Sequence, residues 1–130
     1  MAEKLKFSDE HLWVRVEGDQ VRVGLSDYLQ NKLGEIISVH LPDAGDEIER
    51  GEPLGELESN NEVHELISPV TGVVVATNIE LEDQPILANE DPYHAGWLIE
   101  VELRDETEFD DLIDPDEYEE LISGEADDDE

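Results

Sequence analysis

The stretch that decides the fold is LESNNEVHELISPVTG, residues 57–72. A strand-like run ends at Glu58 and Ser59, two asparagines follow, and a second run leads into Ser-Pro-Val-Thr-Gly. Asparagine tolerates positive φ and is common in hairpin turns. The stretch therefore predicts two strands joined by a tight turn at Asn60 and Asn61. We expect the second run to be buried at four positions: Val63, Leu66, Ile67 and Val70.

The residues before this hairpin carry signals for another hairpin and a helix. Apolar and polar side chains alternate over residues 12–16 and 21–24, with glycine-containing turn chemistry between the two runs. Ser26 is a good helix N-cap, and Gly34 suits the position just after a helix C-terminus. We therefore expect a β-hairpin followed by a short helix near residues 27–33.

Short apolar runs punctuated by glycine occur on both sides of the central hairpin, around Gly45 and Gly51 before it and Gly72 after it. Each half is expected to form a small sheet whose apolar face must pack against the other half. Two such halves resemble the pseudo-symmetric halves of lipoyl and biotinyl carrier domains. The predicted fold class is mainly β with short helices, a barrel-sandwich hybrid of this carrier type.

The last part of the chain has apolar residues at helical spacing. Pro115 suits the first turn of a final helix behind an Asp114 cap, and Gly124 suits its end. The residues after Gly124 are almost all acidic. We therefore predict C-terminal helices, a single domain over residues 1–124, and a disordered acidic tail over residues 125–130.

The charge balance is extreme, with 38 acidic residues against 7 basic ones and a formal net charge of −31. Nucleic acid and anionic membranes are therefore poor partners, because binding them requires Lys and Arg. A basic protein partner fits this field better. Salt adaptation of the host is a further interpretation of the same charge.

The first residues lack the apolar stretch of a secretory signal, so we expect a cytoplasmic location. The absence of cysteine excludes disulfides and thiolate chemistry.

Several motifs, in order over residues 7–122, resemble the glycine cleavage system H protein family. The residues that match its pattern are His11, Trp13, Val23, Gly24, Ser26, Asp27, Tyr28, Leu33, Gly34, Leu41, Pro42, Glu58, Ser59, Ser68, Pro69, Val70, Gly72 and the segment Asn-Glu-Asp-Pro-Tyr-x-x-Gly-Trp at 89–97. The resemblance implies a shuttle rather than an enzyme. In that family a lipoyl arm accepts an aminomethyl group from glycine decarboxylase and presents it to an aminomethyltransferase. Dihydrolipoyl dehydrogenase then reoxidises the arm.

The resemblance places the family's lipoylated lysine on Asn61. An asparagine carboxamide cannot form the lipoyl amide, because its nitrogen lone pair is delocalised into the carbonyl. Lysine occurs in this chain only at positions 4, 6 and 32. We therefore expect a protein that cannot itself be lipoylated and that has no cofactor. Glu58 and Gly72 still match features that lipoyl-attaching enzymes are thought to recognise.

Three functional hypotheses follow. The first is a partner-binding or regulatory paralogue of the H protein, with glycine decarboxylase, aminomethyltransferase, dihydrolipoyl dehydrogenase or lipoyl-handling enzymes as partners. The second is an aminomethyl carrier that works by a route the sequence does not reveal. The third is an enzyme or metal-binding protein on the same fold.

The third hypothesis depends on His64 with Glu62 and Glu65. A single histidine between two acidic residues is a weak metal signal, and an exposed strand histidine explains it better. His11, His40 and His94 lie beside no nucleophile in the sequence, so we predict no catalytic residues and no metal site. Four aromatic residues are expected in the core rather than in a cofactor site: Trp13, Tyr28, Trp97 and Phe109.

Overall fold

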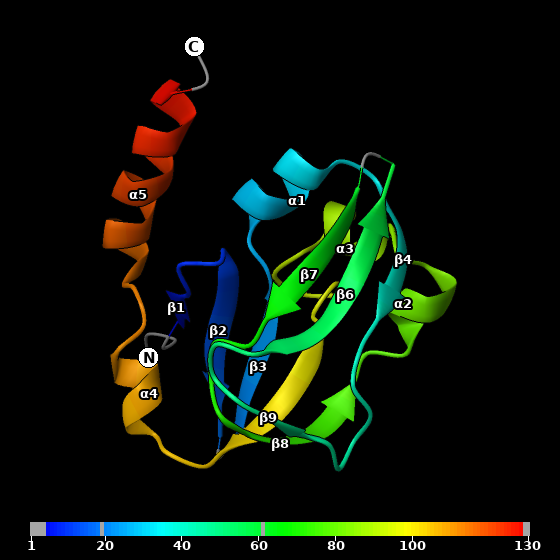
Figure 1. Cartoon of the computed structure of the whole chain (residues 1–130), viewed down its shortest axis with the longest axis vertical. Helices are drawn as coiled ribbons and strands as arrows, with labels where there is room; N and C mark the ends of the chain where they lie inside the picture. Colours follow the sequence, from blue (N-terminus) through cyan, green and yellow to red (C-terminus); the bar gives the residue numbers. More distant parts are fainter. Residues whose placement is uncertain (1–4, 19, 61, 129–130) are drawn as a thin grey trace.

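A computed structural model describes residues 5–18, 20–60 and 62–128 of the chain. Two antiparallel sheets and several short helices make up the described structure (Figure 1). The strands are β1 (Leu5–Phe7), β2 (Leu12–Glu17), β3 (Gln20–Leu25), β4 (Ile36–His40), β5 (Glu47–Ile48), β6 (Pro53–Ser59), β7 (Val63–Ile67), β8 (Gly72–Thr77) and β9 (Ile99–Leu103). The helices are α1 (Asp27–Leu33), α2 (Glu80–Asp83), α3 (Leu87–Glu90), α4 (Thr107–Asp110) and α5 (Pro115–Asp128).

The larger sheet has six strands in the order β1-β2-β3-β9-β8-β5, and the smaller has three in the order β4-β6-β7. Figure 1 shows the β6–β7 hairpin in front of the larger sheet, with α1 near the hairpin tip and α5 at the side. Apolar side chains from both sheets form one core between them. Leu57 and Leu66 of the small sheet lie in the same cluster as Val14, Val23 and Val101 of the large one, and all five are 1% exposed or less.

The first hairpin and α1 form where the sequence predicts them. Trp13 of β2 lies opposite Gly24 of β3, where a Cβ would stand 2.5 Å from the indole ring. The Ser26 hydroxyl accepts a hydrogen bond from the Leu29 amide at 3.1 Å, which makes Ser26 the N-cap of α1. Gly34 ends the helix with φ of 87°, a conformation that favours glycine.

Three details differ from the sequence-based expectation. α5 continues past Gly124 to Asp128, because one glycine costs a helix only about 1 kcal/mol and the next residues permit helix. The short helices α2 and α3 were not predicted. Val63 is 57% exposed instead of buried, because it lies opposite Glu58 on the outer face of the small sheet.

Of the four aromatic residues expected in the core, Trp13 and Phe109 are buried, whereas Tyr28 and Trp97 are partly exposed. Among the described residues, every helix is too short or too polar to span a lipid bilayer.

Candidate functional site

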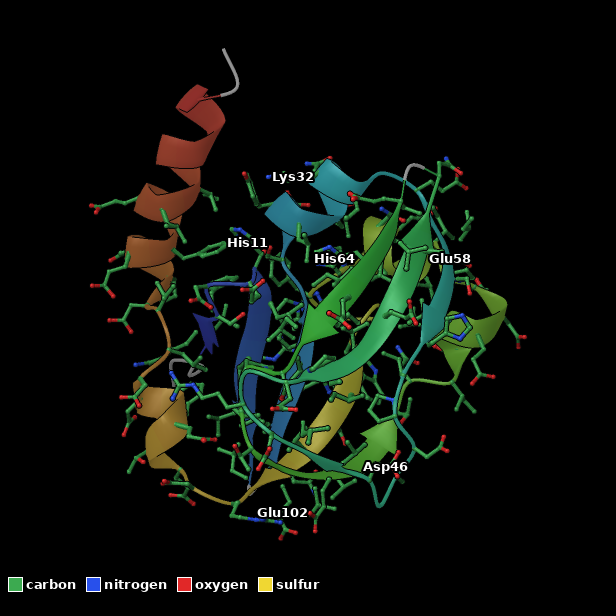
Figure 2. The ribbon with its side chains drawn as sticks, viewed as in Figure 1. His11, Lys32, Asp46, Glu58, His64 and Glu102 are labelled. Carbon is green, nitrogen blue, oxygen red and sulfur yellow. The ribbon has the colours of Figure 1, made fainter. Side chains whose placement is uncertain are left out.

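The β6–β7 hairpin contains most of the sequence stretch 57–72. Its strands pair in register as Glu56 with Glu65, Leu57 with His64, and Glu58 with Val63. Because side chains alternate across a strand, Leu57 faces the core while Glu56 and Glu58 face away from it. Figure 2 shows Glu58 on β6 and His64 on β7, below the hairpin tip.

Hydrogen bonds hold the residues that flank position 61 in the hairpin. The Ser59 amide donates to the Glu62 carbonyl at 2.8 Å, which closes the turn. The Asn60 amide donates to the Glu35 carbonyl at 3.1 Å, and Asn60 Nδ2 donates to Glu35 Oε1 at 3.3 Å. The tip is thereby tied to the loop between α1 and β4. Asn61, which the sequence singled out, lies outside the described residues.

Asn89 supports this loop from α3. Its side chain accepts a hydrogen bond from the Ile36 amide at 2.8 Å and donates to the Gly34 carbonyl at 2.8 Å. Gly34 and Ile36 flank Glu35, so Asn89 indirectly positions the residue that holds the tip. The sequence pattern alone predicts no separate role for Asn89. Its place between α1 and β4 depends on a contact across more than fifty residues, which no local signal reveals.

The segment Ser68-Pro69-Val70-Thr71-Gly72 is held by its own contacts. The Ser68 hydroxyl donates to the Val70 carbonyl at 2.6 Å, and the Val70 side chain is fully buried. The Thr71 amide and hydroxyl donate to the two oxygens of the Glu108 carboxylate at 2.6 and 2.9 Å. Gly72 lies so close to β9 that a Cβ would stand 2.2 Å from the Glu102 carbonyl oxygen. These residues therefore have clear packing roles.

A cavity of about 430 Å³ opens beside this segment. Its walls come from three parts of the chain: residues 7–10, residues 50–51 with 67–69, and residues 111–113. Among the described residues that line it, Arg50 is the one basic residue, and Asp9, Glu10 and Asp111 are acidic. Arg50 forms a salt bridge with Asp111 at 3.2 Å, so its charge is already matched.

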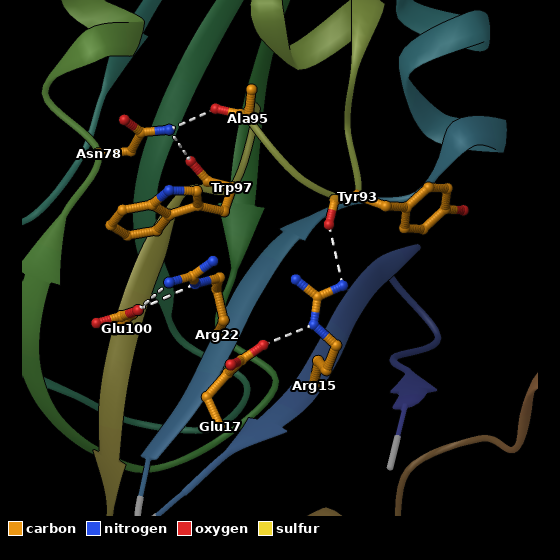
Figure 3. A network of polar contacts seen from close by, with 8 residues as sticks. All are labelled: Arg15, Glu17, Arg22, Asn78, Tyr93, Ala95, Trp97 and Glu100. Carbon is orange, nitrogen blue, oxygen red and sulfur yellow. Dashed lines mark hydrogen bonds and ion pairs between the residues drawn. The ribbon is translucent and has the colours of Figure 1, made fainter. Parts of the chain in front are cut away.

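The segment 89–97 is also fixed by polar contacts, which come from β2 and from the residue that follows β8 (Figure 3). Arg15 donates to the Tyr93 carbonyl at 3.0 Å and forms an ion pair with Glu17. Asn78 Nδ2 donates to the carbonyls of Ala95 and Trp97, both at 2.8 Å. This segment therefore shapes the scaffold and brings no reactive group to the hairpin.

The four histidines are dispersed. His11 is 2.9 Å from the Tyr118 hydroxyl, His40 is 3.3 Å from the Ser38 hydroxyl, and His94 is 3.3 Å from Asp91. His64 and Glu65 are adjacent on β7, so their side chains point to opposite faces of the sheet. Within the described part of the chain, no three metal-ligating side chains converge. The structure therefore gives the metal hypothesis no support.

Comparison with known proteins gives a consistent result. A family model described as glycine cleavage H-protein matches residues 5–125. The glycine cleavage system H protein of Halalkalibacterium halodurans is 50% identical over 122 residues, which cover 94% of this chain and 95% of the relative. The protein of the same name from Staphylococcus carnosus is 49% identical over 120 residues, which cover 92% of this chain and 95% of the relative.

These matches overturn the expectation that no cofactor belongs to this protein. That expectation followed from one position, whereas residues 5–125 match the glycine cleavage H-protein family, whose cofactor is lipoate. Lipoate is therefore the group to test against the site. Covalent attachment needs an amine, and the hairpin from Pro53 to Ile67 contains no lysine. Lys6 is paired with Asp114 at 3.2 Å, and the Lys32 ammonium lies 5.6 Å from the centre of the Tyr28 ring. The residues present do not fit an amide-linked lipoyl group on the hairpin.

The solved structures agree with the sequence matches. The crystal structure of a glycine cleavage system H protein from Mycobacterium marinum is similar to this fold with a TM-score of 0.85. The two chains are 31% identical, and the match covers 95% of this chain and 99% of the other. The predicted fold class, mainly β with short helices, is thereby confirmed. The chain belongs to the glycine cleavage H-protein family.

Proposed function

We propose that this chain serves glycine cleavage or lipoate metabolism as a non-enzymatic, partner-binding or regulatory paralogue of the H protein. In this proposal Asn61 stands at the family's attachment position, so the chain does not carry a lipoyl group there. Any lipoyl group that it meets is attached to another protein. The observation that carries the proposal is a hairpin that is hydrogen-bonded to the loop between α1 and β4 and whose sequence contains no lysine side chain to accept lipoate.

The scaffold around the tip supports a binding role. Asn60 donates two hydrogen bonds to Glu35, and Asn89 bonds to the residues on either side of Glu35, so the hairpin is held in place for a partner to bind. Glu58 and Gly72, which resemble recognition features for lipoyl-attaching enzymes, lie on ordered strands on either side of the tip. A partner that recognises H proteins through these two positions would find both of them here.

The proposed partners are the enzymes that the family serves: glycine decarboxylase, aminomethyltransferase, dihydrolipoyl dehydrogenase and the lipoyl-handling enzymes. The chain would compete with a lysine-bearing H protein for the same enzymes. Titration of each purified enzyme from the same source with the unmodified chain tests this competition directly.

A lipoylation assay tests the role of position 61. The wild-type chain, Asn61→Lys and the neighbouring control Asn60→Lys are each incubated with lipoate, ATP and a lipoate–protein ligase, and intact mass is measured. We expect one lipoyl group on Asn61→Lys and none on the wild type or on Asn60→Lys. A lipoyl adduct on the wild-type chain would overturn the proposal and favour a direct carrier role. If Asn61→Lys stays unmodified, the ligase does not recognise this hairpin, and the claim of an intact recognition surface is wrong.

A further inference from the structure

The two sheets have four edge strands, and three of them are protected. The edge of β1 is covered by Ile113, whose amide and carbonyl both bond to Phe7 at 2.8 Å. β5 consists of only two residues. β4 has an irregular register between Ile36 and Ser38, and α2 packs beside it. Short strands, irregularities and covering segments are the usual ways to prevent unwanted strand pairing.

β7 is the exception. It is the outer strand of the three-stranded sheet, it pairs in regular register from Val63 to Leu66, and it is five residues long. Within residues 5–18, 20–60 and 62–128, β6 is the one strand that pairs with it. Val63 on this strand is 57% exposed. β7 therefore presents a regular strand edge to solvent.

The register shows which main-chain groups point outward. The Ser59 amide donates to the Glu62 carbonyl, so these two residues form a hydrogen-bonded pair. Such pairs alternate with pairs whose main-chain groups point away from each other. The next pair, Glu58 with Val63, and the pair Glu56 with Glu65 are of this second kind. The amides and carbonyls of Val63 and Glu65 therefore point away from β6.

The same edge has an unfavourable charge arrangement. Glu56 and Glu65 lie directly opposite each other on the exposed face, in the kind of pair that brings side chains closest. Like charges in this position destabilise a sheet. Among the described residues, no Lys or Arg forms an ion pair with either carboxylate. A basic group from outside the chain would relieve this repulsion.

We propose that the outer edge of β7 binds an extended, basic segment of a partner protein, which adds a fourth strand to the small sheet. The outward amides and carbonyls of Val63 and Glu65 supply the main-chain hydrogen bonds. Lysine or arginine side chains of the partner lie against Glu56 and Glu65. A second copy of this chain is the wrong occupant, because pairing β7 with itself would bring together two chains of net charge −31.

This inference rests on the proposed partner-binding role and specifies its surface. The added strand would lie along β7, next to the hairpin that the proposed function assigns to partner binding. The partner segment is expected to be basic because Glu56 and Glu65 are acidic. It is expected to be extended because β7 pairs in a regular register.

Peptide binding tests the inference. The probe is a fluorescent octapeptide of alternating lysine and valine, measured by anisotropy against the full-length chain. One control peptide has the same sequence with N-methyl groups on its valines, which keeps the charge and removes the strand hydrogen bonds. A second control replaces lysine with glutamate. We expect saturable binding of the first peptide, loss of at least about tenfold in affinity on N-methylation, and no binding of the acidic peptide.

Two variants locate the site. Val63→Pro removes one outward amide and leaves the β6 ladder intact, whereas Val63→Thr keeps that amide and changes only the side chain. We expect the proline variant to lose about tenfold in peptide affinity and the threonine variant to bind like the wild type. Equal binding of the plain and N-methylated peptides would show charge attraction alone and overturn the inference.

The same variants separate this inference from the proposed function. If a glycine cleavage enzyme binds the wild type and Val63→Pro equally, the β7 edge is not the docking surface, while the partner-binding role stands. If the peptide binds β7 but no glycine cleavage or lipoyl-handling enzyme binds the chain, the proposed function fails and the strand-edge site remains.

Discussion

Glu35 holds Asn60 at the hairpin tip through two hydrogen bonds, one from the Asn60 amide to the Glu35 carbonyl and one between the two side chains. Glu35 belongs to the loop between α1 and β4, so Asn60 is bonded to that loop. The support continues inward to Asn89, which bonds on either side of Glu35. Asn60 in the surface turn is thus connected to α3 through hydrogen bonds to the loop that contains Glu35.

Asn89→Ala should destabilise the protein and loosen the tip. The substitution leaves the amide of Ile36, a residue that is 1% exposed, without its acceptor. An unsatisfied buried amide costs about 1–3 kcal/mol, so the free energy of unfolding in urea should fall by that amount. Hydrogen exchange at the Asn60 amide should become faster. Asn31→Ala, at an exposed site on α1, is the matched control and should change neither quantity. Unchanged exchange at Asn60 in Asn89→Ala would show that the tip does not depend on this support.

Glu108→Gln should weaken the attachment of α4 to the segment after the hairpin. The Glu108 carboxylate accepts from both the amide and the hydroxyl of Thr71. Hydrogen bonds to a charged acceptor contribute more than neutral ones, so we expect a loss of about 1–2 kcal/mol in unfolding free energy. The control is Glu106→Gln, an exposed site two residues earlier. Equal stability of the two variants would contradict a structural role for Glu108.

Gly72→Ala should be poorly tolerated for steric reasons alone. The added methyl group would stand 2.2 Å from the Glu102 carbonyl oxygen, so β8 and β9 would have to separate. Overpacking of this kind costs about 1–3 kcal/mol. Ala76→Gly on the same strand removes a methyl group instead and should cost less than about 1 kcal/mol. If Gly72→Ala keeps wild-type stability but is no longer recognised by a lipoate ligase in the Asn61→Lys background, Gly72 acts in recognition instead of packing.

Much of this architecture could be predicted from local signals. The two strands of the central hairpin, the Ser26 cap and the Gly34 stop each depend on neighbouring residues, and each lies where the sequence places it. The burial of Val63 was predicted wrongly because the inward face of β7 is set by its register with β6, which the run of residues alone does not define.

Other features depended on longer-range information. The roles of Asn78 and Asn89 were missed because their hydrogen bonds join segments that are distant in sequence. The cofactor expectation was wrong because a single position was given more weight than the family to which the chain belongs. The assignment of residue 61 to the attachment position, and the division of the chain at residue 124, stay predictions.

Salt should stabilise this protein. With a net charge of −31, the folded state carries strong self-repulsion, as between Glu56 and Glu65. The Debye length shortens from about 30 Å at 0.01 M salt to about 3 Å at 1 M, which screens that repulsion. The melting temperature should therefore rise with KCl concentration, and sucrose at equal osmolality controls for general solvent effects. A melting temperature that stays flat from low to molar salt would contradict both this account and the idea of salt adaptation.

Tyr93 should make the protein less stable at high pH. Burial raises the pKa of the Tyr93 phenol above its usual value of 10.0, and the nearby Asp27 carboxylate acts in the same direction. The hydrogen bond from the Asp27 amide to the phenol oxygen, 2.9 Å long, opposes this rise in pKa. Because the folded state binds the phenolic proton more tightly, its contribution to stability is complete below pH 10 and is lost as the pH rises through the folded-state pKa.

The absorbance of phenolate reports tyrosine ionisation as the pH is raised. Because the chain has three tyrosines, the curve of Tyr93 must be separated from the other two. The difference between the wild type and Tyr93→Phe gives the curve of Tyr93 alone, and its midpoint should lie above 10.0. The fall in unfolding free energy between pH 9 and pH 11 should be smaller in Tyr93→Phe than in the wild type, because the variant has no phenol to titrate at this position. A Tyr93 midpoint at or below 10.0 would show that the Asp27 amide outweighs burial at this site.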